Sequence, residues 1–208
     1  MLPRRYTMAE SRIHLLLLVG LLFAREWCNA DQNTSERRDI VKFLDTSELI
    51  WTVYTTKPSL PCKVDQKTFL NATIITFQRS HYSKRIGNWT YKHLQGAFGY
   101  WLPTQRKYYD AINISRVGEA SSWTTEEALY YQNEDNTCGV FLTTYRGKSI
   151  NIYTAELRMK NSSLEKSPSQ DCMQKFNESR WRKKFYKLYS PDCQKKVEQH
   201  SWVFSTSP

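Results

Sequence analysis

Residues 134–145, EDNTCGVFLTTY, join an acidic turn cluster to a run of β-branched and aromatic residues. Side chains alternate between the two faces of a strand, so the residues from 138 onward fall into two sets. One set comprises Cys138, Val140 and Leu142, and the other comprises Gly139, Phe141, Thr143 and Tyr145. If Cys138 leaves the strand to form a disulfide outside, Gly139 faces inward and its missing side chain leaves room there. A β-bulge glycine is the alternative reading of Gly139.

Similar segments follow one another along most of the chain. Six further runs rich in β-formers lie at 48–57, 67–78, 88–98, 107–115, 127–132 and 149–159, separated by turn clusters such as NEDN and YRGKS. A helix is expected at 39–46 and another at 169–181, and KFYKLYS (184–190) has the composition of a final strand. Seven or eight strands in series, flanked by two helices, predict a mainly β, antiparallel barrel, although the same pattern is compatible with a sandwich.

The N-terminus has the three parts of a secretory signal peptide. Arginines in the first twelve positions precede an apolar run, LLLLVGLLF (15–23), and a small-residue cleavage site that ends at Ala30. The apolar run is too short to span a bilayer. We therefore expect a signal peptide at 1–30, a secreted product and one domain at 31–208. Removal of four arginines and two glutamates with the leader leaves 26 Lys+Arg against 18 Asp+Glu, a charge of +8.

Four cysteines remain after the leader, at Cys62, Cys138, Cys172 and Cys193. An even number in an oxidising compartment predicts two disulfides, for which three connectivities are possible. Zinc sites use closely spaced cysteine pairs, and none is present, so we expect no metal.

Six N-x-S/T sequons follow the leader, at Asn33, Asn71, Asn88, Asn113, Asn161 and Asn177. Several are expected to carry glycans, which must face solvent. A glycan on Asn113 would turn Tyr108, Asp110, Ile112 and Ile114 inward by alternation. Asp110 would then be a buried carboxylate, which requires a cation or hydrogen-bond donors, either from a ligand or from a lysine or arginine of the barrel.

The chain resembles the tick salivary lipocalins of the histamine-binding-protein family over nearly its whole mature length. The most specific segments are ELIWTVYTTKPSLPC (48–62), DNTCGVF (135–141) and YTAELRMK with QDCMQKFNES and LYSPDC (153–193). The resemblance implies a monomeric, eight-stranded antiparallel lipocalin barrel with a short N-terminal helix and a C-terminal helix packed outside. It also implies disulfides Cys62–Cys193 and Cys138–Cys172, each stabilising the fold by about 4–5 kcal/mol.

The resemblance also implies an interior that sequesters a biogenic amine such as histamine or serotonin. Glu156 matches the family's Glu-Leu motif, and Glu127 lies near a second acidic family position. The full set of candidate ligand-binding residues is Asp39, Trp51, Tyr108, Asp110, Glu127, Phe141 and Glu156. The signature is partial, because Arg38 stands where amine-binding members have a cysteine and Ile50 stands where they have an aromatic residue.

Two other functions fit the same sequence. An acidic lipid mediator, such as a leukotriene or another fatty acid, would suit the aromatic content and basic rim candidates Arg79, Lys84, Arg85, Lys92 and Arg106. A protein- or heparin-binding surface is suggested by the cluster Arg180, Arg182, Lys183 and Lys184 around Trp181. An enzyme is not expected, because the histidines are isolated and neither a nucleophile elbow nor a phosphate loop is present. We expect no cofactor, nucleic acid or membrane partner.

Overall fold

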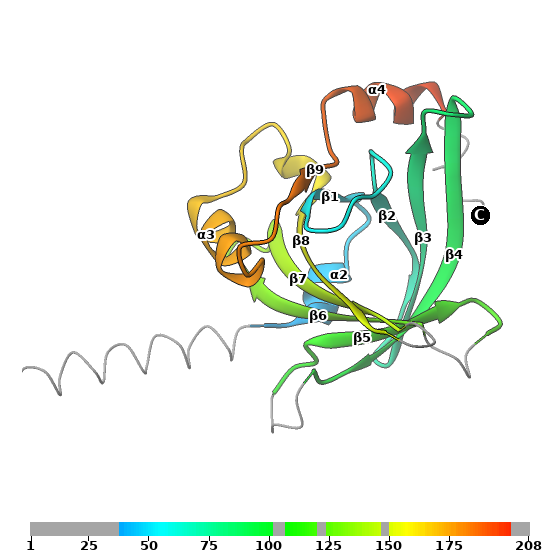
Figure 1. The fold of residues 1–208 in the computed structure, drawn as a ribbon. Coiled ribbons are helices and arrows are strands. Elements are labelled where there is room, and N and C mark those ends of the chain that lie inside the picture. Colours follow the sequence, from blue (N-terminus) through cyan, green and yellow to red (C-terminus); the bar gives the residue numbers. More distant parts are fainter. Residues whose placement is uncertain (1–37, 102–106, 120–123, 147–149, 201–208) are drawn as a thin grey trace, which may run out of the picture. The chain divides into compact units, whose positions relative to one another are not determined.

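The computed structural model describes residues 38–101, 107–119, 124–146 and 150–200. The expected signal peptide, the sequon at Asn33 and the rim candidate Arg106 lie outside these ranges. Eight strands follow one another: β1 Ile50–Thr55, β2 Val64–Leu70, β3 Ile74–Ser83, β4 Asn88–Gly99, β5 Ala111–Arg116, β6 Thr125–Gln132, β7 Cys138–Tyr145 and β8 Ile152–Lys160. The remaining elements are α2 Ile40–Leu44, the 3-10 helix η1 Asn161–Ser163, α3 Gln170–Ser179, β9 Tyr186–Lys187 and α4 Asp192–Gln199 (Figure 1).

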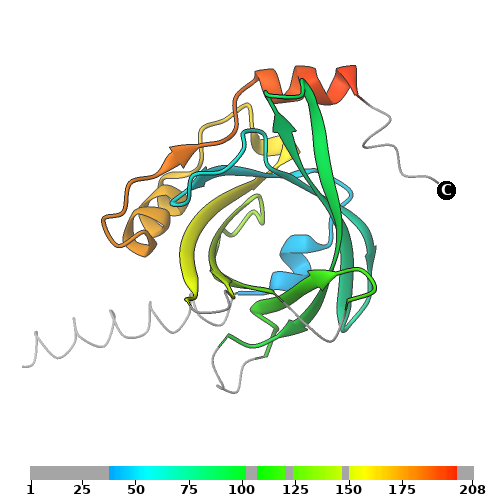
Figure 2. The same ribbon diagram turned by 45° about the vertical axis from the view of Figure 1, so that its right-hand side comes forward.

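The strands form a closed antiparallel barrel, as the sequence predicted. Each strand pairs with the next, and β1 closes the ring by pairing with β8 on one side and β2 on the other. The contact between β1 and β2 is short, with Ile50 opposite Asp65 and Trp51 opposite Val64. Farther along the same edge of β1, β9 pairs with Tyr54 and Thr55. Figure 2 looks into the resulting ring of strands.

Helix α2 fills one end of the ring (Figure 2). Asp39 caps the helix by accepting a hydrogen bond from the backbone N–H of Lys42 at 2.9 Å. The apolar face of α2, formed by Ile40, Phe43 and Leu44, is buried in the cluster of side chains inside the barrel. The β6–β7 turn also holds the helix, because the Asn136 side chain donates to the Lys42 carbonyl. The barrel is therefore plugged at the α2 end.

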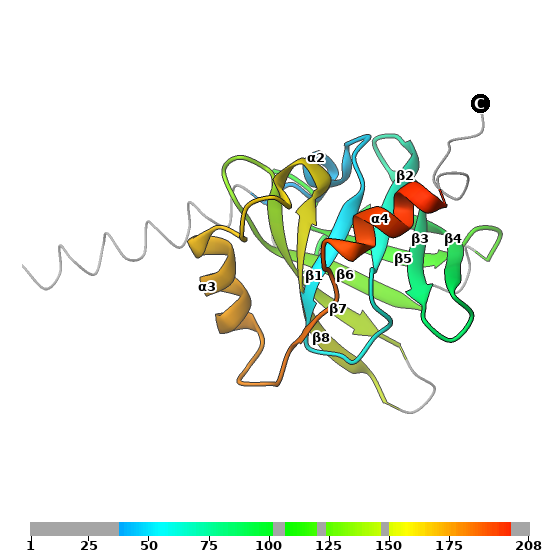
Figure 3. The same ribbon diagram turned by 90° about the horizontal axis from the view of Figure 1, so that it is seen from above.

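The other helices lie outside the strands. Helix α3 packs on β7 and β8, where Cys138 bonds to Cys172, and α4 lies near the end of the β3–β4 hairpin (Figures 1 and 3). The outward set of β7 contacts α3 in one buried cluster, which confirms the predicted orientation of that strand. The second disulfide joins Cys62 to Cys193 at the start of α4. Both pairings match those that the family resemblance implied.

Two segments differ from the sequence-based expectation. Residues 67–78 were expected to form one strand, but the chain turns back at Asn71 and divides them between β2 and β3. The Asn71 side chain causes this turn, because its oxygen accepts hydrogen bonds from the backbone N–H groups of Thr73 and Ile74. Near the C-terminus, the expected strand at 184–190 is only the two residues of β9, and the helix α4 was not predicted.

Gly139 faces the interior, as expected, but the room it leaves is occupied. A methyl group built on Gly139 would lie 3.0 Å from the Phe43 ring and 3.1 Å from the Phe141 ring. These two rings contact each other edge to face, with centroids 5.4 Å apart. The space that Gly139 leaves is therefore filled by Phe43 of helix α2, which plugs the barrel. The expectation that Gly139 leaves free room inside the barrel is wrong.

We predict that Gly139→Ala lowers the free energy of unfolding by about 1–3 kcal/mol, because the added methyl group overpacks the contact between α2 and β7. Urea unfolding of the purified protein measures this change. Gly99→Ala is the matched control, since a side chain there meets nothing within 4 Å. Adding Phe43→Leu to Gly139→Ala should recover part of the loss, and equal effects of the two glycine substitutions would contradict this packing.

Candidate functional site

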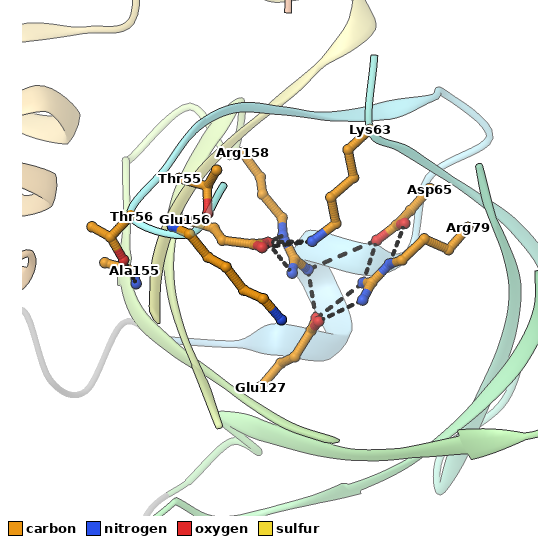
Figure 4. Close-up of polar contacts among 10 residues, drawn as sticks. Thr55, Thr56, Lys63, Asp65, Arg79, Glu127, Ala155, Glu156 and Arg158 are labelled. Carbon is orange, nitrogen blue, oxygen red and sulfur yellow. Dashed lines mark hydrogen bonds and ion pairs between the residues drawn. The ribbon is translucent and has the colours of Figure 1, made fainter. Parts of the chain in front are cut away.

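Six charged side chains meet inside the barrel. They come from β2, β3, β6, β8 and the residue before β2, and all are less than one-tenth exposed: Lys63, Asp65, Arg79, Glu127, Glu156 and Arg158. Figure 4 shows them joined across the middle of the ring. Three are acidic and three are basic, so the cluster, here called the ion-pair network, is neutral when all six are ionised.

One half of the network is centred on Glu156. The ammonium of Lys63 donates to both carboxylate oxygens of Glu156, at 2.6 and 2.7 Å. The guanidinium of Arg158 donates to Glu156 Oε2 from Nε at 3.0 Å and from Nη2 at 2.6 Å. Glu156 therefore has two resident cations, and neither of its oxygens lacks a donor.

The other half is centred on Glu127. Arg158 Nη1 donates to Glu127 at 2.6 Å, and Arg79 donates to the same carboxylate at 2.7 and 3.3 Å. Arg79 also binds both oxygens of Asp65 at 2.7 Å. Each guanidinium thus bridges two carboxylates, which is the geometry that its planar, multi-donor shape favours.

The charges set the protonation states of the network. Burial alone would raise the pKa of Glu156, but Lys63 and Arg158 overcome it and lower the pKa to about 2. The pKa of Glu127 is likewise well below its ordinary value, because Arg158 and Arg79 outweigh burial. Lys63 behaves differently: burial lowers its pKa to about 8, since Glu156 only partly compensates and Arg79 and Arg158 repel it. Lys63 is the least well-compensated charge of the six.

Strand alternation accounts for three of these positions. In β8, Glu156 and Arg158 are two residues apart and share the inner face. In β3, Arg79 follows the buried Ile75 and Phe77 at the same spacing. Arg79 was expected at the rim, and Asp65, Lys63 and Arg158 were not among the predicted site residues. Alternation from Phe77 would have indicated Arg79, and alternation from Glu156 would have indicated Arg158. Nothing in the sequence pattern indicates Lys63, which lies in the segment between two strands.

The space between the network and α2 is narrow and mostly apolar. A cavity of only about 10 Å3 there is lined by apolar side chains, by Lys67 and by four network members. The apolar residues are Leu44 of α2, Ile50, Ile75, Phe77 and Ile112. Side chains therefore fill most of the α2 half of the barrel, as is usual for barrels of this size.

On the other side of the network, the inner wall is polar. Thr143 and Thr154 lie opposite each other on β7 and β8, are 1% and 3% exposed, and have hydroxyls without a hydrogen-bond partner in the described structure. Nδ1 of His81, two residues beyond Arg79 on β3, is also buried without a partner. Burial, with Lys63 and Arg79, lowers the pKa of His81 to about 4, so its ring is neutral at physiological pH. Each of these atoms has hydrogen-bonding capacity that the described residues do not use.

The structure separates the sequence-predicted ligand residues into two groups. Glu127, Glu156 and Phe141 face the interior, and the guanidinium of Arg158 lies 4.3 Å from the Phe141 ring centroid. Trp51 instead faces outward, packs against Tyr189 and donates to Asn161. It is therefore not part of the inner wall.

Three other predicted residues lie near the α2 end. Asp39 caps α2, as described above. Asp110 is fully buried, but its carboxylate accepts from the Trp101 backbone N–H at 2.9 Å and does not line the pocket. Tyr108 was expected to face inward, but it is 38% exposed because β5 begins only at Ala111 and strand alternation does not extend to it.

The predicted basic cluster and several of the sequon asparagines lie at the protein surface. The basic cluster at 180–184 lies after α3, with Arg182, Lys183 and Lys184 exposed and Trp181 60% exposed. Polyanion binding by this cluster stays a prediction. Of the described sequon asparagines, Asn71 and Asn177 are exposed, whereas Asn161 accepts hydrogen bonds from Trp51 and Gln194.

Two features are absent from the described ranges. No helix there is long and apolar enough to cross a membrane. No group of three or more His, Cys, Asp or Glu side chains in those ranges is placed to hold a metal ion.

Several solved structures are similar to this chain in fold. The crystal structure of the AM182 serotonin complex has 16% sequence identity to this chain. The match covers 74% of this chain and 91% of AM182, with a TM-score of 0.53. Apocrustacyanin C2 has 9% identity, coverage of 78% and 86%, and a TM-score of 0.51. The siderocalin Ex-FABP, described as having dual ligand specificities, has 9% identity, coverage of 69% and 93%, and a TM-score of 0.50.

These similarities establish the fold. A closed antiparallel barrel with a helix packed outside its C-terminal strands is the lipocalin fold. No protein-family model and no curated protein matches the chain.

We predict that Arg158→Met lowers the free energy of unfolding by about 3–5 kcal/mol, because Glu127 and Glu156 lose their shared buried cation. Adding Glu127→Gln should recover part of this loss. Lys67→Met is the control, since it breaks only the partly exposed pair with Asp45, with an expected cost below about 1 kcal/mol. Chemical unfolding measures all three variants, and a loss for Arg158→Met as small as that of the control would contradict a tightly coupled network.

We also predict that the wild-type protein loses stability as pH falls from 6.5 to 4. The folded-state pKa of His81 is about 4, below the ordinary 6.5, so protonation in this interval favours the unfolded chain. His81→Gln should flatten the dependence of unfolding free energy on pH between 6.5 and 4.5. Below pH 4.5, both proteins should lose the contribution of ionised Glu156 to the free energy of unfolding, because its folded-state pKa is about 2. Identical curves for both proteins above pH 4.5 would show that His81 titrates normally.

Proposed function

We propose that the protein is a secreted lipocalin that sequesters one small organic mediator in the part of its barrel away from α2. The lipocalin fold supports this proposal, because such barrels hold a ligand among inward-facing side chains. The signal-like N-terminus and the two disulfides support secretion. The sequence segments quoted above support membership of the tick histamine-binding-protein family, with a host mediator at the feeding site as the target.

The unpartnered polar atoms on the inner wall carry the proposal. A buried hydroxyl without a partner destabilises the protein by about 1–3 kcal/mol. Thr143 and Thr154 present two such hydroxyls side by side on β7 and β8, and His81 presents a buried ring nitrogen without a partner on β3, across the barrel from them. A polar group of a ligand that hydrogen-bonds them would recover this free energy, and this makes the wall a binding surface.

The charges nearby favour an acidic ligand. The three carboxylates of the network are already paired with Lys63, Arg79 and Arg158. The ammonium of Lys57 lies 3.9 Å from the Tyr145 ring centroid, and Lys92 lies opposite the network residue Arg79 in the β3–β4 pairing. A carboxylate-bearing lipid, such as a leukotriene or another fatty acid, would find hydroxyl donors on the wall and lysines nearer the mouth.

A biogenic amine of the histamine or serotonin type is the second candidate. The fold similarity to a serotonin complex and the inward position of Glu156 favour it. An amine would nevertheless have to compete with Lys63 and Arg158 for that carboxylate. The acidic ligand needs no such displacement, so we place it first.

Calorimetric titration of the purified protein with leukotriene B4, arachidonic acid, histamine and serotonin tests this proposal. We expect saturable binding of one acidic lipid and no saturable binding of either amine. Combined Thr143→Val and Thr154→Val should weaken the affinity about tenfold, the effect of losing hydrogen bonds to a ligand. Thr144→Val is the matched control, because Thr144 lies on the outer face of the same strand.

Tighter binding of an amine than of any acid would reverse the order of the two candidates. The absence of saturable binding by all four compounds would count against the acid and amine classes proposed here.

A further inference from the structure

Lys63 differs from the other two cations of the network in how it is held. Arg158 bridges Glu156 and Glu127, and Arg79 bridges Glu127 and Asp65. Lys63 contacts Glu156 alone, through one ammonium group at the end of a flexible chain. Removing either arginine would leave two carboxylates without a shared cation, whereas removing Lys63 affects one.

The position of the Lys63 ammonium is that of a bound amine. Its nitrogen lies 2.6 and 2.7 Å from the two Glu156 oxygens, within a wall that is almost closed to solvent. Thr55 lies opposite Glu156 in the β1–β8 pairing and is also buried. Beyond the β-carbon, the side chain of Lys63 is itself a short alkylammonium. A small primary amine would make the same contacts if this side chain were absent.

The backbone keeps Lys63 in this position. It follows Cys62, which adopts a left-handed conformation (φ 54°) and is bonded to Cys193. The Lys63 carbonyl accepts from the Thr52 backbone N–H at 3.0 Å, which ties the residue to β1. The disulfide and this hydrogen bond therefore fix where the chain enters the barrel wall, and the side chain reaches Glu156 from there.

We propose that Lys63 determines the ligand class of this barrel, because its ammonium occupies on Glu156 the place that a ligand ammonium would take. The wild-type interior is therefore closed to amines at this position, and shortening Lys63 opens a site for a small primary ammonium ion. The inference deepens the proposed function by naming the residue that selects against amines.

Lys63→Ala tests the proposal with propylammonium chloride as the probe. The variant should be less stable than the wild type, because Glu156 keeps only Arg158. Propylammonium should raise its melting temperature and bind it at least about tenfold more tightly than it binds the wild type, measured by calorimetry at pH 7. Sodium chloride at equal concentration controls for ionic strength.

Two further variants complete the experiment. The double variant Lys63→Ala, Glu156→Gln lacks both the lysine ammonium and the glutamate carboxylate. The melting temperature of this variant should not respond to propylammonium. If Lys63→Ala does not fold in buffer, the test is whether it refolds when propylammonium is present. The same test is repeated with Lys63→Gln and methylammonium, because the longer side chain leaves a smaller cavity. Recovery of folding by the ammonium ion supports the proposal, and failure of both variants to respond overturns it.

Equal affinity of the wild type and Lys63→Ala for propylammonium would also overturn the proposal. These readings are independent of the proposed function, because acidic-lipid binding is measured on the wild type. Loss of one conclusion therefore leaves the other standing.

Discussion

The interior of this barrel depends on one neutral set of ion pairs between three carboxylates and three cations. Arg158 is its centre, because it joins Glu156 on one side to Glu127 on the other. The network spans the barrel (Figure 4). Four of its members line the small apolar cavity beside Leu44 of α2. Buried charges are tolerated only when they are paired and hydrogen-bonded, so each member constrains the position of the others.

This constraint changes what a buried acid means for function. Glu156 is 2% exposed, as an amine-binding carboxylate would be, yet two resident cations already neutralise it. Burial of an acid is therefore insufficient to indicate a cationic ligand, and the charges around it must be counted as well. Among the buried side-chain atoms without a hydrogen-bond partner in the described part of the chain are the neutral groups of Thr143, Thr154 and His81.

Local patterns in the sequence predicted the barrel and much of its orientation. Alternation in 138–145 correctly placed Phe141 inside, and the family resemblance indicated Glu156 and the disulfide pairing. Contacts between distant segments could not be predicted in this way. Lys63, one of the two cations that bind Glu156, lies 93 residues earlier in the chain. The space beside Gly139 is filled by the ring of Phe43, which belongs to a helix that precedes every strand. Such contacts arise from closure of the barrel, which no local pattern specifies.

The most direct test of the account is a crystal structure of the mature protein grown at neutral pH with excess histamine. The account predicts that the Lys63 ammonium remains within hydrogen-bonding distance of both Glu156 oxygens and that no ligand nitrogen contacts this carboxylate. A histamine ammonium bound to Glu156, with Lys63 turned away, would contradict it.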